Sequence, residues 1–117
     1  MVVVRTITIL RNHCIVSELH ITKTLVEPDI EMIKANAILT DGSMLYVSEI
    51  IGDDWRDYSY HWQRDGRMLR RWDNAPHHKE LPSFPHHVHD ENSVLSGDDV
   101  NLADILSFIE TKLKKQN

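Results

Sequence analysis

Hydrophobic and polar residues alternate along much of the chain. In a strand every second side chain lies on the same face, so alternation is typical of strands that bury one face of a sheet. The alternation predicts strands over residues 15–26, 30–40, 44–51, 55–63 and 67–73. Because these strands follow one another with only short connections, we expect consecutive antiparallel neighbours, that is, a β-meander.

The turns and the aromatic residues support this arrangement. Asp41-Gly42 and Asp65-Gly66 lie between consecutive predicted strands, and Asp-Gly pairs readily adopt the positive φ that a tight hairpin needs. Tyr58, Tyr60 and Trp62 share one face of their strand, so we expect them in the core. We also expect Trp72 opposite Trp62 as a cross-strand pair.

The helical pattern is ambiguous at the start of the chain and clear near its end. Residues 2–13 are rich in β-branched residues but also place apolar residues at helical spacing, which favours a short helix or an irregular start. Residues 101–114 form a clear amphipathic helix, with Asn101 or Asp99 as its N-cap. The chain thus predicts an α+β fold in a single domain over residues 1–117. It is an antiparallel β-meander of about five strands with a C-terminal helix packed on one face.

One stretch has an unusual composition. Residues 58–89 hold six of the eight histidines, in part as two Pro-His-His steps at residues 76–78 and 85–87. Residues 74–92 contain three prolines and no clear periodicity, which predicts a loop. A structureless connection of this length in a small domain is usually functional or disordered, and its aromatic and histidine content argues against disorder.

Composition limits the class of protein. The net charge of −5 argues against a protein that coats nucleic acid over its whole surface. Residues 55–89, however, carry a net charge of +2 on a chain whose remainder carries −7, so an anionic substrate or an acidic partner would suit this region. A single cysteine fits a reducing compartment. No apolar run is long enough to span a membrane, and we expect a cytoplasmic protein.

The histidines and cations suit cleavage of RNA without a metal. Two histidines can act as general base and general acid at one phosphodiester because imidazole titrates near neutrality, and a cation can stabilise the phosphorane. A carboxylate can orient one of the histidines, as in catalytic triads. The candidate catalytic residues are His78, His87, Arg71, Asp73 and His89.

A second set of residues could bind the substrate. An aromatic ring can stack on a base, and cations can bind phosphates. Arg70 and Arg71 point to opposite faces of one strand, so only one of them can enter a given site. The candidate substrate-binding residues are Arg70, Lys79, Trp72 and His61.

Two other interpretations remain open. In one, the proline-flanked histidines only brace the loop, and the protein is a non-enzymatic interaction or regulatory module. In the other, His87 and His89 join His77 or His78 to hold a metal ion in a hydrolase. The histidine spacing is looser than in any standard zinc motif, so we expect no metal and no cofactor.

The central stretch resembles a known family. The segments YSYHWQ, DGRMLRRWDNAPHH and LPSFPHHVHD, followed by a short acidic spacer and a helix, resemble the TumE family over residues 55–90. TumE-like proteins are small toxin components of toxin–antitoxin pairs. The resemblance implies a cognate antitoxin, normally a helix-turn-helix protein. Our interpretation is a type II toxin that acts as a metal-independent endoribonuclease, with RNA as a ligand and a homodimer as further expectations.

Overall fold

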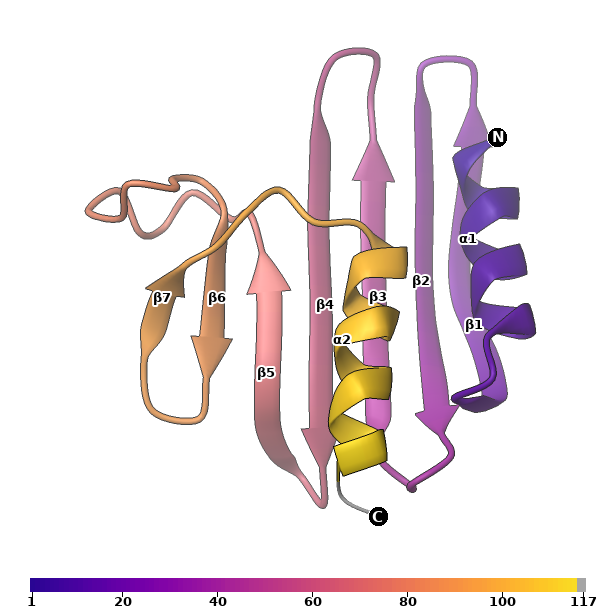
Figure 1. Ribbon diagram of the computed structural model, residues 1–117. Helices are drawn as coiled ribbons and strands as arrows, with labels where there is room; N and C mark the ends of the chain where they lie inside the picture. The colour runs from indigo at the N-terminus through magenta and orange to yellow at the C-terminus, as the bar shows by residue number, and fades with distance from the viewer. Residues whose placement is uncertain (116–117) are drawn as a thin grey trace.

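The computed structural model describes residues 1–115. Seven strands form one antiparallel sheet in which the spatial order follows the chain order (Figure 1). The strands are β1 (Val16–Glu27), β2 (Ile30–Leu39), β3 (Met44–Ile51), β4 (Arg56–Arg64), β5 (Arg67–Asp73), β6 (His87–Asp90) and β7 (Val94–Ser96). Helix α1 (Val2–Asn12) precedes the sheet, and helix α2 (Leu102–Lys115) follows it.

Tight turns produce the meander. Gly42 has φ +87° between β2 and β3, and Gly66 has φ +76° between β4 and β5. Residues that carry a side chain rarely adopt this left-handed backbone conformation, so glycine is favoured at both turns. Asp41 also receives hydrogen bonds from the backbone N–H and the hydroxyl of Ser43, at 3.0 and 2.5 Å. The predicted hairpins are therefore confirmed.

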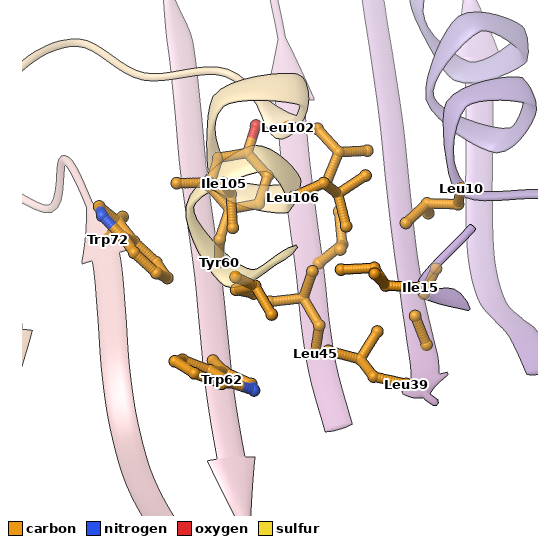
Figure 2. Packing of buried hydrophobic residues seen from close by; sticks show 14 of the residues in the cluster. Leu10, Ile15, Leu39, Leu45, Tyr60, Trp62, Trp72, Leu102, Ile105 and Leu106 are labelled. Atoms are coloured by element: carbon orange, nitrogen blue, oxygen red, sulfur yellow. The ribbon is translucent and has the colours of Figure 1, made fainter. Parts of the chain in front are cut away.

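Both helices lie on the same face of the sheet (Figure 1). The core lies between this face and the helices, and Figure 2 shows Tyr60, Trp62 and Trp72 packed there with Leu106 and Leu45. The predicted burial of Tyr58, Tyr60 and Trp62 is confirmed, with exposed fractions of 4%, 0% and 5%. The α+β meander with a C-terminal helix on one face is thus confirmed.

Burial and a tertiary contact explain helix α1. The α1 segment is rich in β-branched residues, but Val3, Thr6 and Leu10 are buried at helical spacing. Glu31 on β2 accepts hydrogen bonds from the N–H groups of Val2 and Val3 at the start of α1. These groups have no partner within a helix, so a tertiary contact supplies the cap.

At α2, Asn101 confirms one of the two predicted caps. Its side-chain oxygen accepts from the N–H of Asp104 at 3.0 Å, and the Asp104 carboxylate accepts from the N–H of Asn101 at 3.0 Å. This reciprocal pair is a capping box. The acidic residue in the first turn and the three lysines in the last turn also suit the helix dipole.

The predicted count of about five strands was too low, and one of the two extra strands lies where a loop was predicted, while the other directly follows that segment. Residues 87–90, within the predicted loop 74–92, form β6 along β5, and residues 94–96 form the edge strand β7. Both strands are very short, with 4 and 3 residues. Strands of this length have too few residues to show alternation, so pairing with the preceding strand, β5 for β6 and β6 for β7, defines them rather than sequence pattern.

The register of β4 and β5 also differs from the prediction. Trp72 lies opposite Tyr60, whereas Trp62 lies opposite Arg70. A register shift after Trp62 moves the partner strand by one residue near the hairpin, as β-bulges do. The predicted Trp62–Trp72 pair is therefore wrong, although both rings lie on the helix-covered face (Figure 2).

The two faces of the sheet differ. Alternation places one set of side chains against the helices and the other set on the opposite face, which we call the open face. On β3 and β4 the open face carries half-buried polar residues, namely Tyr46, Ser48, Ser59, His61 and Gln63. No helix within residues 1–115 is long and apolar enough to cross a membrane.

Candidate active site

Three histidine rings meet at the open face beside β5 and β6. His87 and His89 are alternate residues of β6, and His78 comes from the connection between β5 and β6. The ring centroids of His78 and His87 are 4.8 Å apart, those of His87 and His89 4.8 Å, and those of His78 and His89 5.5 Å. All three contacts are edge-on, so the rings form a compact cluster, here called the histidine cluster.

Asp73 is the carboxylate at the base of the cluster. Its side chain is 3% exposed and lies 2.8 Å from His87 Nε2, 3.7 Å from His89 Nε2 and 2.9 Å from Arg71 Nε. It also accepts a hydrogen bond from the N–H of Ala75 at 3.0 Å. A buried carboxylate is stable only when it is paired and hydrogen-bonded, and these groups meet that requirement.

The pairing of β5 with β6 produces this geometry. Asp73 lies opposite His87, and Arg71 lies opposite His89. Directly opposed residues in an antiparallel pair point to the same face, so two alternating positions on each strand bring four functional side chains together.

His87 is held rigidly. Its side chain is 2% exposed, and its Nδ1 lies 3.0 Å from the carbonyl oxygen of Pro85. A carbonyl and a carboxylate can only accept hydrogen bonds, so both contacts are satisfied at once when both ring nitrogens carry hydrogen. In that form His87 is an imidazolium whose charge Asp73 balances.

His78 and His89 are more accessible. Their side chains are 28% and 25% exposed. Nδ1 of His78 lies 3.1 Å from a carboxylate oxygen of Glu80, so Nε2 is the ring nitrogen that a ligand could contact. Burial lowers the pKa of His89 below its usual 6.5, and His87, Arg71 and His78 lower it further, while Asp73 opposes the shift. His89 is therefore neutral near pH 7 and can accept a proton.

Arg71 supplies a cation beside the cluster. Its side chain is 42% exposed. Although Nε lies 2.9 Å from Asp73, its N–H does not point at that oxygen and finds no hydrogen-bond partner among residues 1–115. The contact is thus a charge interaction, and the guanidinium keeps its hydrogen-bonding capacity. A pocket of about 210 Å³ opens beside Arg71 and Asp73, lined also by Ser48, Asp57 and Ser59.

Comparison with known proteins identifies the family. The family model described as Toxin TumE matches residues 6–113. The chain belongs to the TumE toxin family. A search of the curated proteins and a search of the solved structures found no match. Membership implies that this TumE-family chain is the toxin of a toxin–antitoxin system with a cognate antitoxin as its partner.

In this TumE-family chain the five candidate catalytic residues lie together. The cluster and its neighbours include His78, His87, His89, Arg71 and Asp73. Their proximity was predicted from residue types and short spacing alone. Their catalytic roles remain predictions.

The candidate substrate-binding residues are dispersed. Trp72 is buried in the core against Phe108, and the guanidinium of Arg70 lies 4.8 Å from the Phe108 ring centroid. Both therefore lie on the helix-covered face, away from the histidine cluster. Lys79 is exposed in the connection next to His78, and His61 lies on the open face opposite Arg71.

The histidine cluster could also hold a metal. One nitrogen from each of His78, His87 and His89 lies within 4.8 Å of the others. Three imidazoles with an open position are typical of catalytic zinc sites. The hydrogen bond from His87 to Pro85 would orient that ligand, whereas the adjacent Arg71 guanidinium would oppose a dication.

Several residues of the open face beside the cluster are not among the candidate site residues predicted from the sequence. Tyr46, Ser48 and Ser59 line the surface beside the cluster, and the two serines line the pocket. The alternation of residues 44–51 does place Tyr46 and Ser48 on the polar face. The signal that was overlooked is an aromatic residue on the polar face of a strand.

Proposed function

We propose that this toxin is a metal-independent endoribonuclease. The observation that carries the proposal is the pair of accessible imidazoles, His78 and His89, 5.5 Å apart between ring centroids and beside the cation Arg71. This arrangement supplies a base, an acid and a charge stabiliser for one phosphodiester. RNA carries its own nucleophile, the 2′-hydroxyl.

The chemistry would proceed in one displacement. Neutral His89 takes the proton of the 2′-hydroxyl as its oxygen attacks the adjacent phosphorus. His78 in its protonated form donates a proton to the 5′-oxygen as the bond from phosphorus to that oxygen breaks. Arg71 stabilises the charge on the phosphorane oxygens. The products are a 2′,3′-cyclic phosphate and a free 5′-hydroxyl.

His87 and Asp73 act as positioning residues in this proposal. His87 is buried and both of its ring nitrogens are engaged, so it does not contact the RNA. Asp73 holds Arg71 and both strand histidines in place. Loss of either residue should therefore disturb the cluster as a whole.

The test is an RNA cleavage assay with purified protein in EDTA. We expect single-stranded RNA to be cut to 2′,3′-cyclic phosphate ends, and RNA with 2′-O-methyl groups to stay intact because it lacks the nucleophile. Replacing His78 or His89 with alanine should reduce the rate by about 10²–10⁴-fold, the usual contribution of a general acid or base. His77→Ala is the matched control, since His77 is an exposed neighbour outside the cluster.

The outcomes separate this proposal from its alternatives. Full cleavage by both variants, or no cleavage by the wild type, would overturn the ribonuclease proposal. Growth arrest that persists in both variants without cleavage would favour a non-enzymatic module that acts by binding. Thermal melts of each variant show whether a loss of activity reflects unfolding.

A metal-dependent hydrolase is the second candidate, because the three imidazoles lie within 4.8 Å. It predicts stoichiometric zinc or manganese in gently purified protein and activity that EDTA abolishes and metal restores. Activity unaffected by EDTA in protein without bound metal would exclude it.

For the partner, we propose a helix-turn-helix antitoxin that masks the basic histidine-rich region. Residues 55–89 carry a net charge of +2 while the rest of the chain carries −7, which suits an acidic masking segment. Co-expression with the protein encoded by the adjacent gene should restore growth and yield a stable complex.

A further inference from the structure

The open face carries a continuous line of functional side chains that leads to the histidine cluster. Across β3, β4, β5 and β6, Tyr46 lies opposite His61, His61 opposite Arg71, and Arg71 opposite His89. Directly opposed residues point to the same face. With strands about 4.8 Å apart, this line runs roughly 14 Å from Tyr46 to the cluster.

At the far end of the line is an aromatic pair. The Tyr46 and His61 ring centroids are 5.9 Å apart with the planes at 72°, and Gln63 donates a hydrogen bond to the Tyr46 hydroxyl at 3.4 Å. Both residues are half-buried, so part of each ring faces solvent. Bases of single-stranded nucleic acid stack on such rings, and some RNA-binding sheets use aromatic residues in this way.

A second line beside the first carries positive charge. Lys23 on β1 lies directly opposite Lys34 on β2, and Lys34 lies opposite Ser48, which lies opposite Ser59. Like charges at directly opposed positions destabilise a sheet. Among residues 1–115, neither lysine forms an ion pair. An unpaired cross-strand lysine pair suits a polyanion.

The pocket at Ser48 and Ser59 of the second line suits a different group. Ser48, Ser59 and Asp57 line it together with Arg71. Two hydroxyls and a carboxylate can hydrogen-bond the donor and acceptor edge of a base, whereas the carboxylate disfavours a phosphate. Phosphates would instead lie near Arg71 and the lysines.

We propose that the open face binds single-stranded RNA along a track from the histidine cluster to Lys23 and Lys34. In this arrangement Tyr46 and His61 stack an unpaired base, and Arg71 contacts the phosphate that the cluster cleaves. The track crosses six strands, roughly 24 Å at the usual strand spacing. The inference rests on the proposed ribonuclease function, and it adds the substrate class and the residues that bind it outside the cluster.

Binding can be measured without cleavage. The probe is a fluorescein-labelled single-stranded 2′-O-methyl oligonucleotide, which lacks the attacking hydroxyl, and the readout is anisotropy at several salt concentrations. Tyr46→Ala should weaken binding roughly tenfold, the usual effect of one lost base stack, and Tyr46→Phe should bind like the wild type because it keeps the ring. Phe108→Ala is the matched control, since Phe108 packs against Trp72 on the other face.

The salt dependence of the affinity separates the contribution of charge from that of base stacking. Lys34→Gln should weaken binding at low salt and flatten the dependence of log Kd on log salt, because it removes one phosphate contact. The Tyr46→Ala effect should persist at high salt, because stacking is not screened. A duplex of the same sequence should bind more weakly than the single strand, since its bases are already stacked.

Failure of this inference is distinguishable from failure of the proposed function. Equal affinity of Tyr46→Ala and wild type, or no binding by the wild type, overturns the RNA track even if the protein cleaves RNA elsewhere. Loss of binding in Tyr46→Ala without cleavage of ordinary RNA by the wild type supports the track and overturns the ribonuclease proposal. If Tyr46→Ala disrupts the antitoxin complex but leaves RNA affinity unchanged, the face is a protein interface and the track is overturned.

Discussion

Asp73 links the chemistry to the fold at the scale of single residues. It is buried and contacts an arginine and two histidines. The same carboxylate therefore holds the histidine cluster in place and balances its charge. Removing it would leave Arg71 and the doubly protonated ring of His87 close together without compensation, so the electrostatics of this site depend on pairs rather than on single residues.

The pKa values of His61 and His89 should respond to Arg71. Burial is the main cause that lowers the pKa of each ring below 6.5, and the charge of Arg71 lowers both further. In Arg71→Gln both pKa values should therefore rise toward 6.5. Both histidines would then become protonated at a higher pH. Cleavage would be slower because Arg71 stabilises the phosphorane in the proposed reaction, and the remaining activity, which needs neutral His89, would be lost at a higher pH on acidification.

Titration by NMR of the imidazole C–H signals measures these pKa values without any activity assay. The matched control is Arg67→Gln, an exposed arginine of the same strand whose partner is Glu91. Unchanged titration of both rings in Arg71→Gln would contradict the electrostatic description of the site.

At the scale of elements, the connection between β5 and β6 is fixed by side-chain hydrogen bonds, three of them to backbone groups. Asn74 accepts from the N–H of Tyr58 at 2.9 Å and donates to the carbonyl of Arg56 at 2.6 Å. Ser83 donates to the carbonyl of His86 at 2.5 Å, and the Tyr58 hydroxyl lies 2.8 Å from Nδ1 of His86. These contacts hold His78 against β6 although its segment has no strand partner.

Asn74→Ala should therefore loosen the connection. It leaves two half-buried backbone groups of β4 without partners, which costs about 1–3 kcal/mol of unfolding free energy. Urea denaturation measures this loss, and Asn92→Ala, at an exposed position in the β6–β7 turn, should change stability by no more than about 0.5 kcal/mol. RNA cleavage should fall in Asn74→Ala even where the protein is fully folded. Full cleavage in folded Asn74→Ala would show that Asn74 does not position the cluster.

The elements that the sequence predicted are those long enough to show a repeating pattern of apolar and polar residues. Strands β1 to β5 and helix α2 each have enough residues to show alternation or a helical stripe. Helix α1 was ambiguous because its β-branched residues favour a strand, whereas burial of Leu10 and capping by Glu31 favour the helix. Strand β6 was missed because its four residues acquire their identity from pairing with β5.

The composition of the site was predictable, but its orientation was not. Alternation shows that Arg70 and Arg71 point to opposite faces, and the sequence does not say which face the histidines join. The pairing of Arg71 with His89 puts the histidines on the same face as Arg71. Arg70 and Trp72 therefore lie on the other face, against α2. Tyr46 was missed because its importance depends on β3 lying two strands from β5.

For the whole molecule, the two faces of the sheet have separate tasks. The helix-covered face holds the core, and the open face carries the histidine cluster, Arg71 and the aromatic pair. Substitutions on the open face can therefore test function with little effect on packing. Substitutions in the core, where a buried polar network joins the helices to the sheet, should instead change stability.

Glu49 is the centre of that network. It is 5% exposed and accepts hydrogen bonds from Thr6 of α1 at 2.5 Å and from Tyr60 of β4. Arg56 donates to the Tyr60 hydroxyl at 2.9 Å and to the carbonyl of Val100, just before α2, at 2.7 Å. Burial and the neighbouring Glu49 both raise the pKa of Tyr60, so the hydroxyl remains a donor at any ordinary pH. The network connects both helices to the sheet.

Glu49→Ala should destabilise the whole molecule rather than one element. It leaves the buried hydroxyls of Thr6 and Tyr60 without their acceptor, which together costs about 2–4 kcal/mol. For a chain of this length that loss lowers Tm by roughly 10–20 °C. Calorimetry should show a single transition at the lower temperature, because the network spans α1, the sheet and the segment before α2.

Two variants serve as controls. Glu49→Gln retains one acceptor and should lose less stability, and Glu27→Ala, at an exposed position on β1, should melt like the wild type. If Glu49→Ala lost only the signal of one helix and kept the main transition, the two helices would be coupled to the sheet independently.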